Sequence, residues 1–348
     1  MLTVFVFTFL INMFHVPNPG TARNDVPQNE DMERHEFAAP QMGSIFRIVL
    51  YHHDSNIAKA AADSAFRKGE LLNSILSDYL PDSELNRLVQ TAGKDTAVVV
   101  SSHLFELVAT AIEVSEETHG AFDLTVRPLT RLWREVRNSP NPKLPSQADL
   151  QARADCVGYQ DIHLNSVTKG ILLSNPCTEL DAGGIGKGYA AGKMGEILRS
   201  FGIDSFFINA GGDLLAGAPP PGEQGWNIAI SAHHPDGTPR PIPVQLSHTA
   251  LSTSGDLYQF VEIDDVRYSH IIDPKTGMAL KDRRTVTVIG PDPTRVDAYS
   301  TALSVIPAEK AVRFMDNIPD YHVYIERIRD TEVISNRSEG FKPAIPSH

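Results

Sequence analysis

Residues 180–189 read LDAGGIGKGY and lead into a predicted helix over residues 187–201. Three near-adjacent glycines let the backbone approach a ligand closely, and the amides at the start of the helix point toward that approach. The segment differs from the dinucleotide-binding fingerprint, because too few residues separate strand from helix and no acidic partner follows a second strand at the usual distance. It also lacks the G-x-x-x-x-G-K-[ST] spacing of a P-loop. A ligand-binding loop of another kind and a plain tight turn both fit the pattern.

Outward from this loop, the chain alternates strand and helix patterns in both directions. Helices are expected over residues 56–76, 102–118, 187–201 and 296–305, with a short one beginning at Ser83-Glu84 and Ser83 as its N-cap. Strands are expected over residues 44–51, 206–209, 226–230, 244–246, 258–263, 267–272, 285–289 and 321–326, with Asp264-Asp265 as a hairpin turn. Hairpin-joined strands mixed with separate helices predict an α+β fold rather than a parallel doubly wound sheet.

The composition is that of a folded globular protein. Of 348 residues, 41% are hydrophobic and 21% are charged, and 31 Lys and Arg against 43 Asp and Glu give a formal net charge of −12. The length allows two lobes or one large domain, with a core large enough to enclose a ligand site. A nucleic-acid groove needs a basic face, so the acidic balance argues against nucleic acid as a partner. A phosphate-bearing ligand fits where a metal ion supplies the positive charge.

The chain begins with an uncharged apolar run, LTVFVFTFLINMF at residues 2–14. Its length suits a signal-peptide apolar region better than a transmembrane helix, although no positive leader precedes it. We expect export, to the periplasm or with peripheral or signal-anchored membrane association; a cytoplasmic protein with an apolar tail is the alternative. Residues 17–36 read as a polar tether, so the expected division is a segment 1–36, a folded domain 37–335 and a loose tail 336–348.

The two cysteines, Cys156 and Cys177, form neither a C-x-x-C pair nor a zinc spacing. A disulfide between them is possible, but nothing in the sequence supports it. They therefore say little about the redox compartment.

Four further segments carry side chains suited to binding or catalysis. They are NAGGD at residues 209–213, LSTSGD at 251–256, YSHIIDPKTG at 268–277 and VDAYSTA at 296–302. The glycines of the first suit a ring or a diphosphate, the hydroxyls of the second suit phosphate oxygens, and His270 in the third stands near an Asp and a Lys. The ordinary alternatives are a plain turn, a serine-rich turn and a structural histidine.

In the fourth segment, Asp297 and Thr301 are four residues apart and face the same side of the predicted helix. A carboxylate and a hydroxyl near a helix start offer hard oxygen ligands for magnesium. The alternative is an N-capping Asp297 with a solvent-facing Thr301.

Taken together, these segments resemble the ApbE family, from about Met42 to about Glu326. The matching blocks also include Met42-Gly43-Ser44, LSDYLPDSELNRL at residues 76–88 and GAFDLTVRPL at residues 120–129, all in the family's order. The resemblance implies a two-lobed α+β fold with mixed or antiparallel sheets and flanking helices, and FAD held in a cleft between the lobes.

The resemblance also implies a reaction. A magnesium-dependent transferase would move FMN from FAD to a threonine or serine hydroxyl of a target flavoprotein and release AMP. Charge neutralisation and positioning carry most of such a displacement at a diphosphate. The alternatives are a magnesium-dependent FAD pyrophosphatase that yields FMN and AMP, and a non-enzymatic FAD-binding protein.

The site residues that the resemblance implies fall into three groups. For FAD they are Met42, Tyr79, Ala121, Phe122, Asp123, Asp181, Lys187 and Ile272; for the metal, Gly184, Asp297, Ser300 and Thr301; and for activation of the hydroxyl or steadying of the phosphate, His270. Gly184 would bind through its carbonyl oxygen, and Ser300 through a main-chain or hydroxyl oxygen. Lys187 stands where some relatives carry Glu.

Overall fold

The computed structural model describes residues 32–234, 236, 238–255, 259–329 and 332–343. The apolar run at residues 2–14, on which the expectation of export rests, lies outside these residues. No helix in the described ranges is long and apolar enough to cross a membrane.

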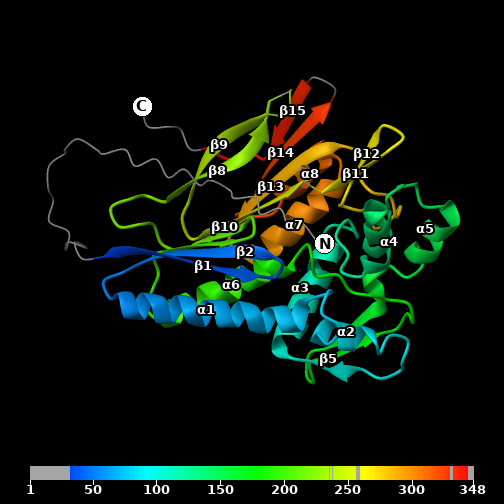
Figure 1. The fold of residues 1–348 in the computed structure, drawn as a ribbon, viewed down its shortest axis with the longest axis horizontal. Helices are drawn as coiled ribbons and strands as arrows, with labels where there is room; N and C mark the ends of the chain where they lie inside the picture. The colour runs from blue at the N-terminus through cyan, green and yellow to red at the C-terminus, as the bar shows by residue number, and fades with distance from the viewer. Residues whose placement is uncertain (1–31, 235, 237, 256–258, 330–331, 344–348) are drawn as a thin grey trace.

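A large antiparallel sheet organises the molecule (Figure 1). In spatial order the strands are β1 (Glu33–Gln41), β2 (Ser44–His52), β6 (Phe206–Ala210), β7 (Asp213–Ala216), β10 (Thr249–Gly255), β13 (Arg283–Gly290), β14 (His322–Arg329) and β15 (Glu332–Arg337). Met42 and Gly43 form the turn between β1 and β2, and both have positive φ, as a two-residue hairpin loop requires. This turn places Met42 at the edge of the site described below.

Smaller sheets flank the large one. They are β3 (Val98–Val99) with β5 (Gly170–Leu173) and β4 (Ile162–Asn165), the hairpin β8 (Trp226–His233) and β9 (Pro239–Leu246), and the hairpin β11 (Phe260–Ile263) and β12 (Val266–Ser269). Asp264 and Asp265 both have positive φ between β11 and β12, which confirms the predicted turn.

One face of the large sheet packs against helices, among them α1 (Ser55–Leu76) and α6 (Gly186–Ser200), and the β8–β9 hairpin covers the other face (Figure 1). The helices are α1 (Ser55–Leu76), α2 (Glu84–Val89), α3 (Ser102–Glu117), α4 (Arg127–Asn138), α5 (Gln147–Ala154), α6 (Gly186–Ser200), α7 (Pro293–Val305) and α8 (Ala308–Asp316), with a 3₁₀ turn at Tyr159–Asp161. Side chains alternate between the two faces along each strand. Ile48 and Ile208 therefore join the helix-side core, and Val49 and Phe207 join the core under the hairpin.

The predicted α+β class is confirmed, and most predicted elements are present within a few residues. Ser83 caps α2 as expected, accepting a hydrogen bond from the amide of Asn86 at 3.0 Å. Helix α4 was not predicted, and β12 ends at Ser269, before the expected 272. Ile272 instead bridges Ala279.

Two expectations about the ends of the domain are wrong. The expected tether to residue 36 overlaps β1, which begins at Glu33 and pairs with β2 along its length. The expected tail from residue 336 overlaps β15, and Phe341 is buried with its ring 5.3 Å from that of Tyr324. Both segments have too few apolar residues to show a strand pattern, but a neighbouring strand supplies their backbone hydrogen bonds.

Cys156 and Cys177 form a disulfide, with Cα atoms 5.2 Å apart. The sequence left this open, because only the fold brings together cysteines that are 21 positions apart. The bond ties the end of the α5 region to the segment that leads into Asp181.

Candidate active site

A cavity of about 2110 Å³ opens where the 180–189 loop, the β10 strand and helix α7 meet. Drug-sized ligands usually occupy about 300–1,000 Å³, so this cavity has room for more than one small molecule. The predicted residues line it, all but Ser300: they are Met42, Tyr79, Ala121, Phe122, Asp123, Asp181, Gly184, Lys187, His270, Ile272, Asp297 and Thr301. Segments far apart in the sequence therefore meet at one place.

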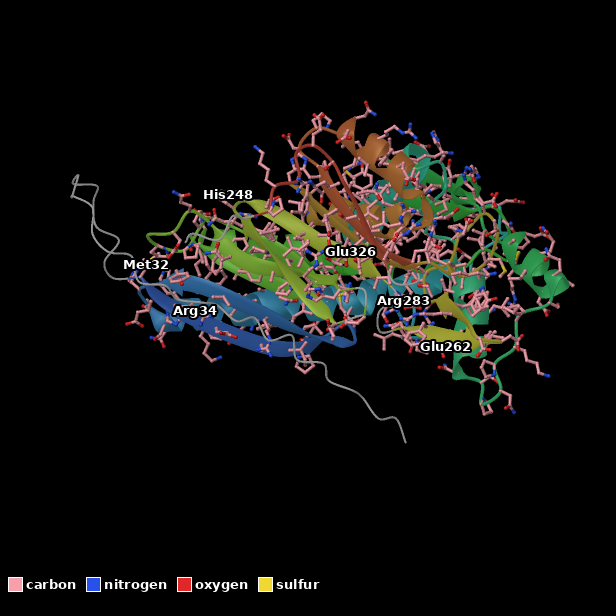
Figure 2. The ribbon with its side chains drawn as sticks, turned by 90° about the horizontal axis from the view of Figure 1, so that it is seen from above. Met32, Arg34, His248, Glu262, Arg283 and Glu326 are labelled. Carbon is pink, nitrogen blue, oxygen red and sulfur yellow. A yellow bond between two sulfur atoms is a disulfide. The ribbon has the colours of Figure 1, made fainter. Side chains whose placement is uncertain are left out.

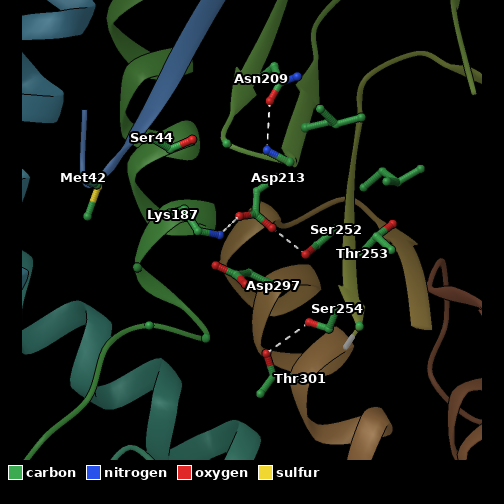
Figure 3. A pocket seen from close by; sticks show the side chains of 18 of the residues that line it. Met42, Ser44, Lys187, Asn209, Asp213, Ser252, Thr253, Ser254, Asp297 and Thr301 are labelled. Carbon is green, nitrogen blue, oxygen red and sulfur yellow. Dashed lines mark hydrogen bonds and ion pairs between the residues drawn. The ribbon is translucent and has the colours of Figure 1, made fainter. Parts of the chain in front are cut away.

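Asp297 lies at the centre of this site (Figure 3). Its side chain is buried on α7, and Oδ2 accepts a hydrogen bond from the amide of Gly188 at 3.0 Å. The N-cap of α7 is Asp292, which accepts from the amide of Thr294 at 2.8 Å. The alternative interpretation of Asp297 as an N-cap is therefore wrong. Thr301 follows one turn later and lines the same cavity.

Glycines allow the 180–189 loop and α6 to approach α7 closely. A Cβ on Gly188 would lie 2.2 Å from the carbonyl oxygen of Pro293 and 2.7 Å from Cβ of Asp297. A Cβ on Gly184 would lie 2.9 Å from Oγ1 of Thr301. The glycine pattern thus serves a close backbone approach, and it places the backbone of Gly184 beside the Thr301 hydroxyl.

An acid that the sequence analysis did not assign, Asp213, completes the centre. It forms an ion pair with Lys187, and its Oδ1 accepts from the hydroxyl of Ser252 at 2.5 Å (Figure 3). Asp213 ends the NAGGD segment, where Gly211 and Gly212 turn with positive φ between β6 and β7. The glycines of NAGGD suggested a ligand site, and the acid that follows them is the feature of the sequence that could have identified Asp213.

The charges at the centre do not balance. Burial, and next the charge of Asp213, raise the pKa of Asp297, while Lys187 opposes that rise. Burial disfavours the charge on Lys187, but Asp213 and Asp297 outweigh it and raise its pKa. Lys187 balances one of the two carboxylates, and a bound cation would balance the second, so that Asp297 could stay ionised despite its burial.

Ser300 lies behind the cavity wall. Its hydroxyl donates to the main-chain oxygen of Asp297 at 2.8 Å and contacts the hydroxyls of Ser252 at 3.1 Å and Ser254 at 2.7 Å. Its main-chain oxygen accepts from Ser304 at 2.9 Å. This geometry favours a supporting role for Ser300 over a direct ligand role.

The donor set fits a magnesium ion. A buried carboxylate, the Thr301 hydroxyl and nearby main-chain oxygens are the hard oxygen donors that magnesium prefers. Among the described residues, no group of three or more His, Cys, Asp or Glu side chains forms a separate metal cluster. A metal here would therefore rely on one or two carboxylates and on oxygens of the substrate.

Two predicted acids shape the wall where FAD is expected. Asp123 is buried and accepts from the amide and hydroxyl of Thr125 at 2.8 and 2.7 Å and from the amide of Tyr159 at 3.0 Å. Asp181 accepts from the hydroxyl of Thr130 at 2.7 Å and the amide of Gly183 at 2.8 Å. Both carboxylates accept from loop amides, and Asp123 thereby fixes the loop that directly follows Ala121 and Phe122. Burial raises the pKa of Asp123.

Two arginines from α4, which were not predicted, line the cavity. The guanidinium of Arg134 lies 4.6 Å from the ring centroid of Tyr79, which is 71% exposed, and it pairs with Asp78 at 3.4 Å. Arg137 lines the same cavity. An arginine stacked on a tyrosine can hold an aromatic base or a phosphate. The sequence analysis missed both because it did not identify α4.

His270 follows β12 and lines the cavity. Its Nδ1 lies 3.2 Å from the main-chain oxygen of Gln259, which can only accept, so Nδ1 carries a proton. In the neutral ring, Nε2 is then the acceptor nitrogen. Ile272, two residues later, is buried in the same wall.

The fold and site define a member of the ApbE family: the family model matches residues 42–325, and the chain belongs to this family. Among its relatives, the FAD:protein FMN transferase of Vibrio cholerae is 32% identical over 82% of this chain and 86% of its own length. A second one, of Klebsiella pneumoniae, is 28% identical over 90% and 96%.

Solved structures agree with this assignment. The flavin transferase ApbE from Vibrio cholerae superposes with a TM-score of 0.80 at 27% identity, covering 89% of this chain and 98% of that one. The flavinyl transferase ApbE of Pseudomonas stutzeri, in its apo form, gives 0.79 at 27% identity, covering 88% and 95%. The predicted fold class is confirmed.

Proposed function

We propose that this chain transfers FMN from FAD to a threonine or serine hydroxyl of a target flavoprotein. The observation that carries the proposal is the gathering of Asp297, Thr301, Lys187, His270 and the FAD-wall residues around one cavity, in a chain whose relatives are named FAD:protein FMN transferase. An apolar wall beside a cluster of oxygen donors suits a flavin on one side and a diphosphate on the other.

The reaction balances as a single displacement. The acceptor oxygen forms a bond to the FMN-side phosphorus, and the bond from that phosphorus to the bridging oxygen breaks. AMP leaves with the bridging oxygen, and the proton of the acceptor hydroxyl passes to a base. His270 is the proposed base, because a neutral imidazole whose Nδ1 donates to the Gln259 carbonyl can accept a proton at Nε2.

Asp297 and Thr301, with main-chain oxygen near Gly184, are the residues proposed to hold magnesium. When bound, the ion supplies charge neutralisation at the diphosphate. Lys187, held by Asp213, keeps a positive charge at the same place. The Tyr79–Arg134 stack and the Ala121–Phe122 wall hold and orient FAD.

A direct assay separates transfer from its alternatives. The protein is incubated with FAD and magnesium, with and without a candidate flavoprotein. A candidate flavoprotein that is co-expressed with the chain is also examined for flavin fluorescence on a denaturing gel. AMP release that depends on the acceptor, with a fluorescent acceptor band, supports transfer. Equal FMN and AMP without an acceptor indicates hydrolysis, and tight FAD without turnover indicates storage.

We also propose that the protein is exported. The disulfide between Cys156 and Cys177 supports this, because such bonds persist mainly in oxidising compartments. Fractionation of cells that express the full chain tests it: recovery of the protein only with cytoplasmic markers would contradict export.

A further inference from the structure

The two long edges of the β8–β9 hairpin differ in their capacity to pair with another strand. The amide of His234 donates to the carbonyl of Thr238 at 2.8 Å, so these two residues form a hydrogen-bonded pair. Hydrogen-bonded and non-hydrogen-bonded pairs alternate in an antiparallel ladder, so from this pair toward the start of β8 every second pair is hydrogen-bonded. The pairs in between include Ala229 with Pro243 and Ser231 with Pro241. The backbone groups of these residues point outward, away from the partner strand.

A contact at the end of β8 agrees with this register. The amide of His233, another outward position, donates to Oε1 of Glu326 on β14 at 2.6 Å. Glu326, which is labelled in Figure 2, is buried, and it also accepts from Arg240 at 2.8 Å. The outward edge of β8 is therefore able to bind acceptors where the fold provides them.

The outer edge of β9 is blocked. Pro241 and Pro243 occupy outward positions, and proline has no amide hydrogen to offer. Prolines at such positions prevent strand addition at an exposed edge. On β8 the matching outward positions are Asn227, Ala229 and Ser231, none of which is proline.

The open edge of β8 faces the cavity. Within the described part of the chain, β8 pairs with β9 alone, and the outward backbone groups of Asn227, Ala229 and Ser231 make no hydrogen bond. All three residues line the same cavity as Asp297 and His270. Pro241 and Pro243 of β9 line this cavity as well, but they offer no amide, so the β8 edge is the part of the hairpin that can pair fully along the reaction site.

We propose that the β8 edge binds the acceptor segment of the target flavoprotein as an added antiparallel or parallel strand. This inference rests on the proposed transfer to a protein hydroxyl. An extended segment adds to a sheet edge through main-chain hydrogen bonds, which do not depend on its sequence. The acceptor hydroxyl must reach the phosphorus, so the segment that carries it has to enter this cavity.

The position of β8 relative to the FAD wall supports this occupant. Figure 1 shows α4 and the β8–β9 hairpin on opposite sides of α7, the helix that carries Asp297. Tyr79 stacks on Arg134 of α4, and Ile272 packs in one cluster with Leu129 and Trp133 of α4. Tyr79 and Ile272 therefore lie toward α4, which leaves the β8 edge for the acceptor.

The test compares two alanine-to-proline variants of the full chain. Ala229→Pro removes an outward amide of β8, while Ala38→Pro removes an outward amide of β1 at an exposed position that does not line the cavity. The acceptor is a flavoprotein that the wild-type chain labels on the denaturing gel. We expect Ala229→Pro to raise the KM for the acceptor about tenfold, since the loss of one or two hydrogen bonds is of that size. Ala38→Pro should behave as wild type.

A second measurement uses the wild-type chain, so it does not depend on the folding of a variant. Peptides of the labelled acceptor segment are N-methylated on one or the other set of alternate amides and tested as competitors of transfer. Strand pairing predicts that one set competes as well as the unmodified peptide and the other competes poorly.

Equal KM values for the two proline variants, or equal competition by the two peptide sets, would overturn this inference alone. Faster transfer by Ala229→Pro would also overturn it, because the edge would then bind a segment that competes with the acceptor. No transfer by the wild-type chain while FAD stays bound would overturn the proposed function and this inference with it.

Discussion

At the scale of single residues, Asp297 is the group on which the metal proposal depends. Asp297→Asn should lower magnesium-dependent AMP release by roughly a hundredfold or more, because it removes the charged ligand at the diphosphate. The fold should remain, since the change relieves a buried negative charge beside Asp213. AMP release against magnesium concentration, with thermal unfolding alongside, measures both effects.

Asp292→Asn is the matched control for Asp297→Asn. Asp292 lies on the same chain segment but outside the reaction cavity, and Asn replaces Asp well as an N-cap. This variant should keep wild-type turnover. Full activity of Asp297→Asn, or turnover unaffected by EDTA, would show that Asp297 serves packing alone.

His270→Gln should reduce the turnover number more than the affinity for FAD. Glutamine can keep a hydrogen bond to the Gln259 carbonyl, but it cannot take up the acceptor proton near neutral pH. We expect a loss of roughly a hundred- to ten-thousandfold in turnover. FAD binding by fluorescence quenching and AMP release under saturating FAD separate the two effects. A variant with near-normal turnover would assign His270 a structural role.

The stability of the protein should fall as the pH falls below 6.5, through His103. Lys68 can only donate to Nε2 of His103 at 3.4 Å, and Nδ1 lies 2.8 Å from the hydroxyl of Tyr189, so the folded ring is neutral. Burial, and next the charge of Lys68, lower its pKa below the ordinary 6.5. The unfolded chain then binds more protons below pH 6.5, so acid favours unfolding.

Urea unfolding of wild type and His103→Gln between pH 8 and 5 measures this effect. The free energy of unfolding of wild type should fall relative to the variant below pH 6.5 and level off below the folded pKa. The slope should stay under about 1.4 kcal/mol per pH unit, the limit for one proton. A constant difference across the range would contradict the neutral ring.

At the scale of elements, the crossing of α6 and α7 sets the geometry of the site. Gly188→Ala should destabilise the fold by about 1–3 kcal/mol, because its Cβ would meet the carbonyl oxygen of Pro293 at 2.2 Å. Gly192→Ala, one turn along the same helix, meets only Cγ of Pro293 at 3.1 Å and gains helix propensity. The change in the free energy of unfolding relative to wild type, measured by denaturant unfolding, should therefore differ in sign or size between the two variants. Equal stabilities would mean that the helices can separate at little cost.

At the scale of the whole molecule, the disulfide closes a loop beside the FAD wall. Reduction, or Cys156→Ser with Cys177→Ser, should lower the free energy of unfolding by about 3 kcal/mol in the chain-entropy account. FAD affinity should also fall, since Cys177 precedes Asp181 by four residues. Denaturant unfolding and FAD titration, each with and without reductant, measure the two effects. The double variant is the control, because reductant should change neither its stability nor its FAD affinity. Unchanged stability of reduced wild type would contradict it.

The sequence alone determined the α+β class, the longer amphipathic elements and a set of site residues that, apart from Ser300, all line the cavity. Apolar residues at helical or alternating spacing reveal elements that bury one face, such as α1 and β2. Strand β9 was predicted only from 244, because its prolines hide a strand that begins at Pro239. The order of several motifs along the chain then indicated the family, whereas a single turn or helix cap does not identify one.

Only the tertiary structure decided how these residues cooperate. Asp213 of β7 pairs with Lys187 of α6, Cys156 meets Cys177, and Ser300 supports the site from behind. The open edge of β8 likewise depends on which pairs of the ladder are hydrogen-bonded. Such relations join residues distant along the chain, and local patterning carries no information about them because they are fixed by packing between elements.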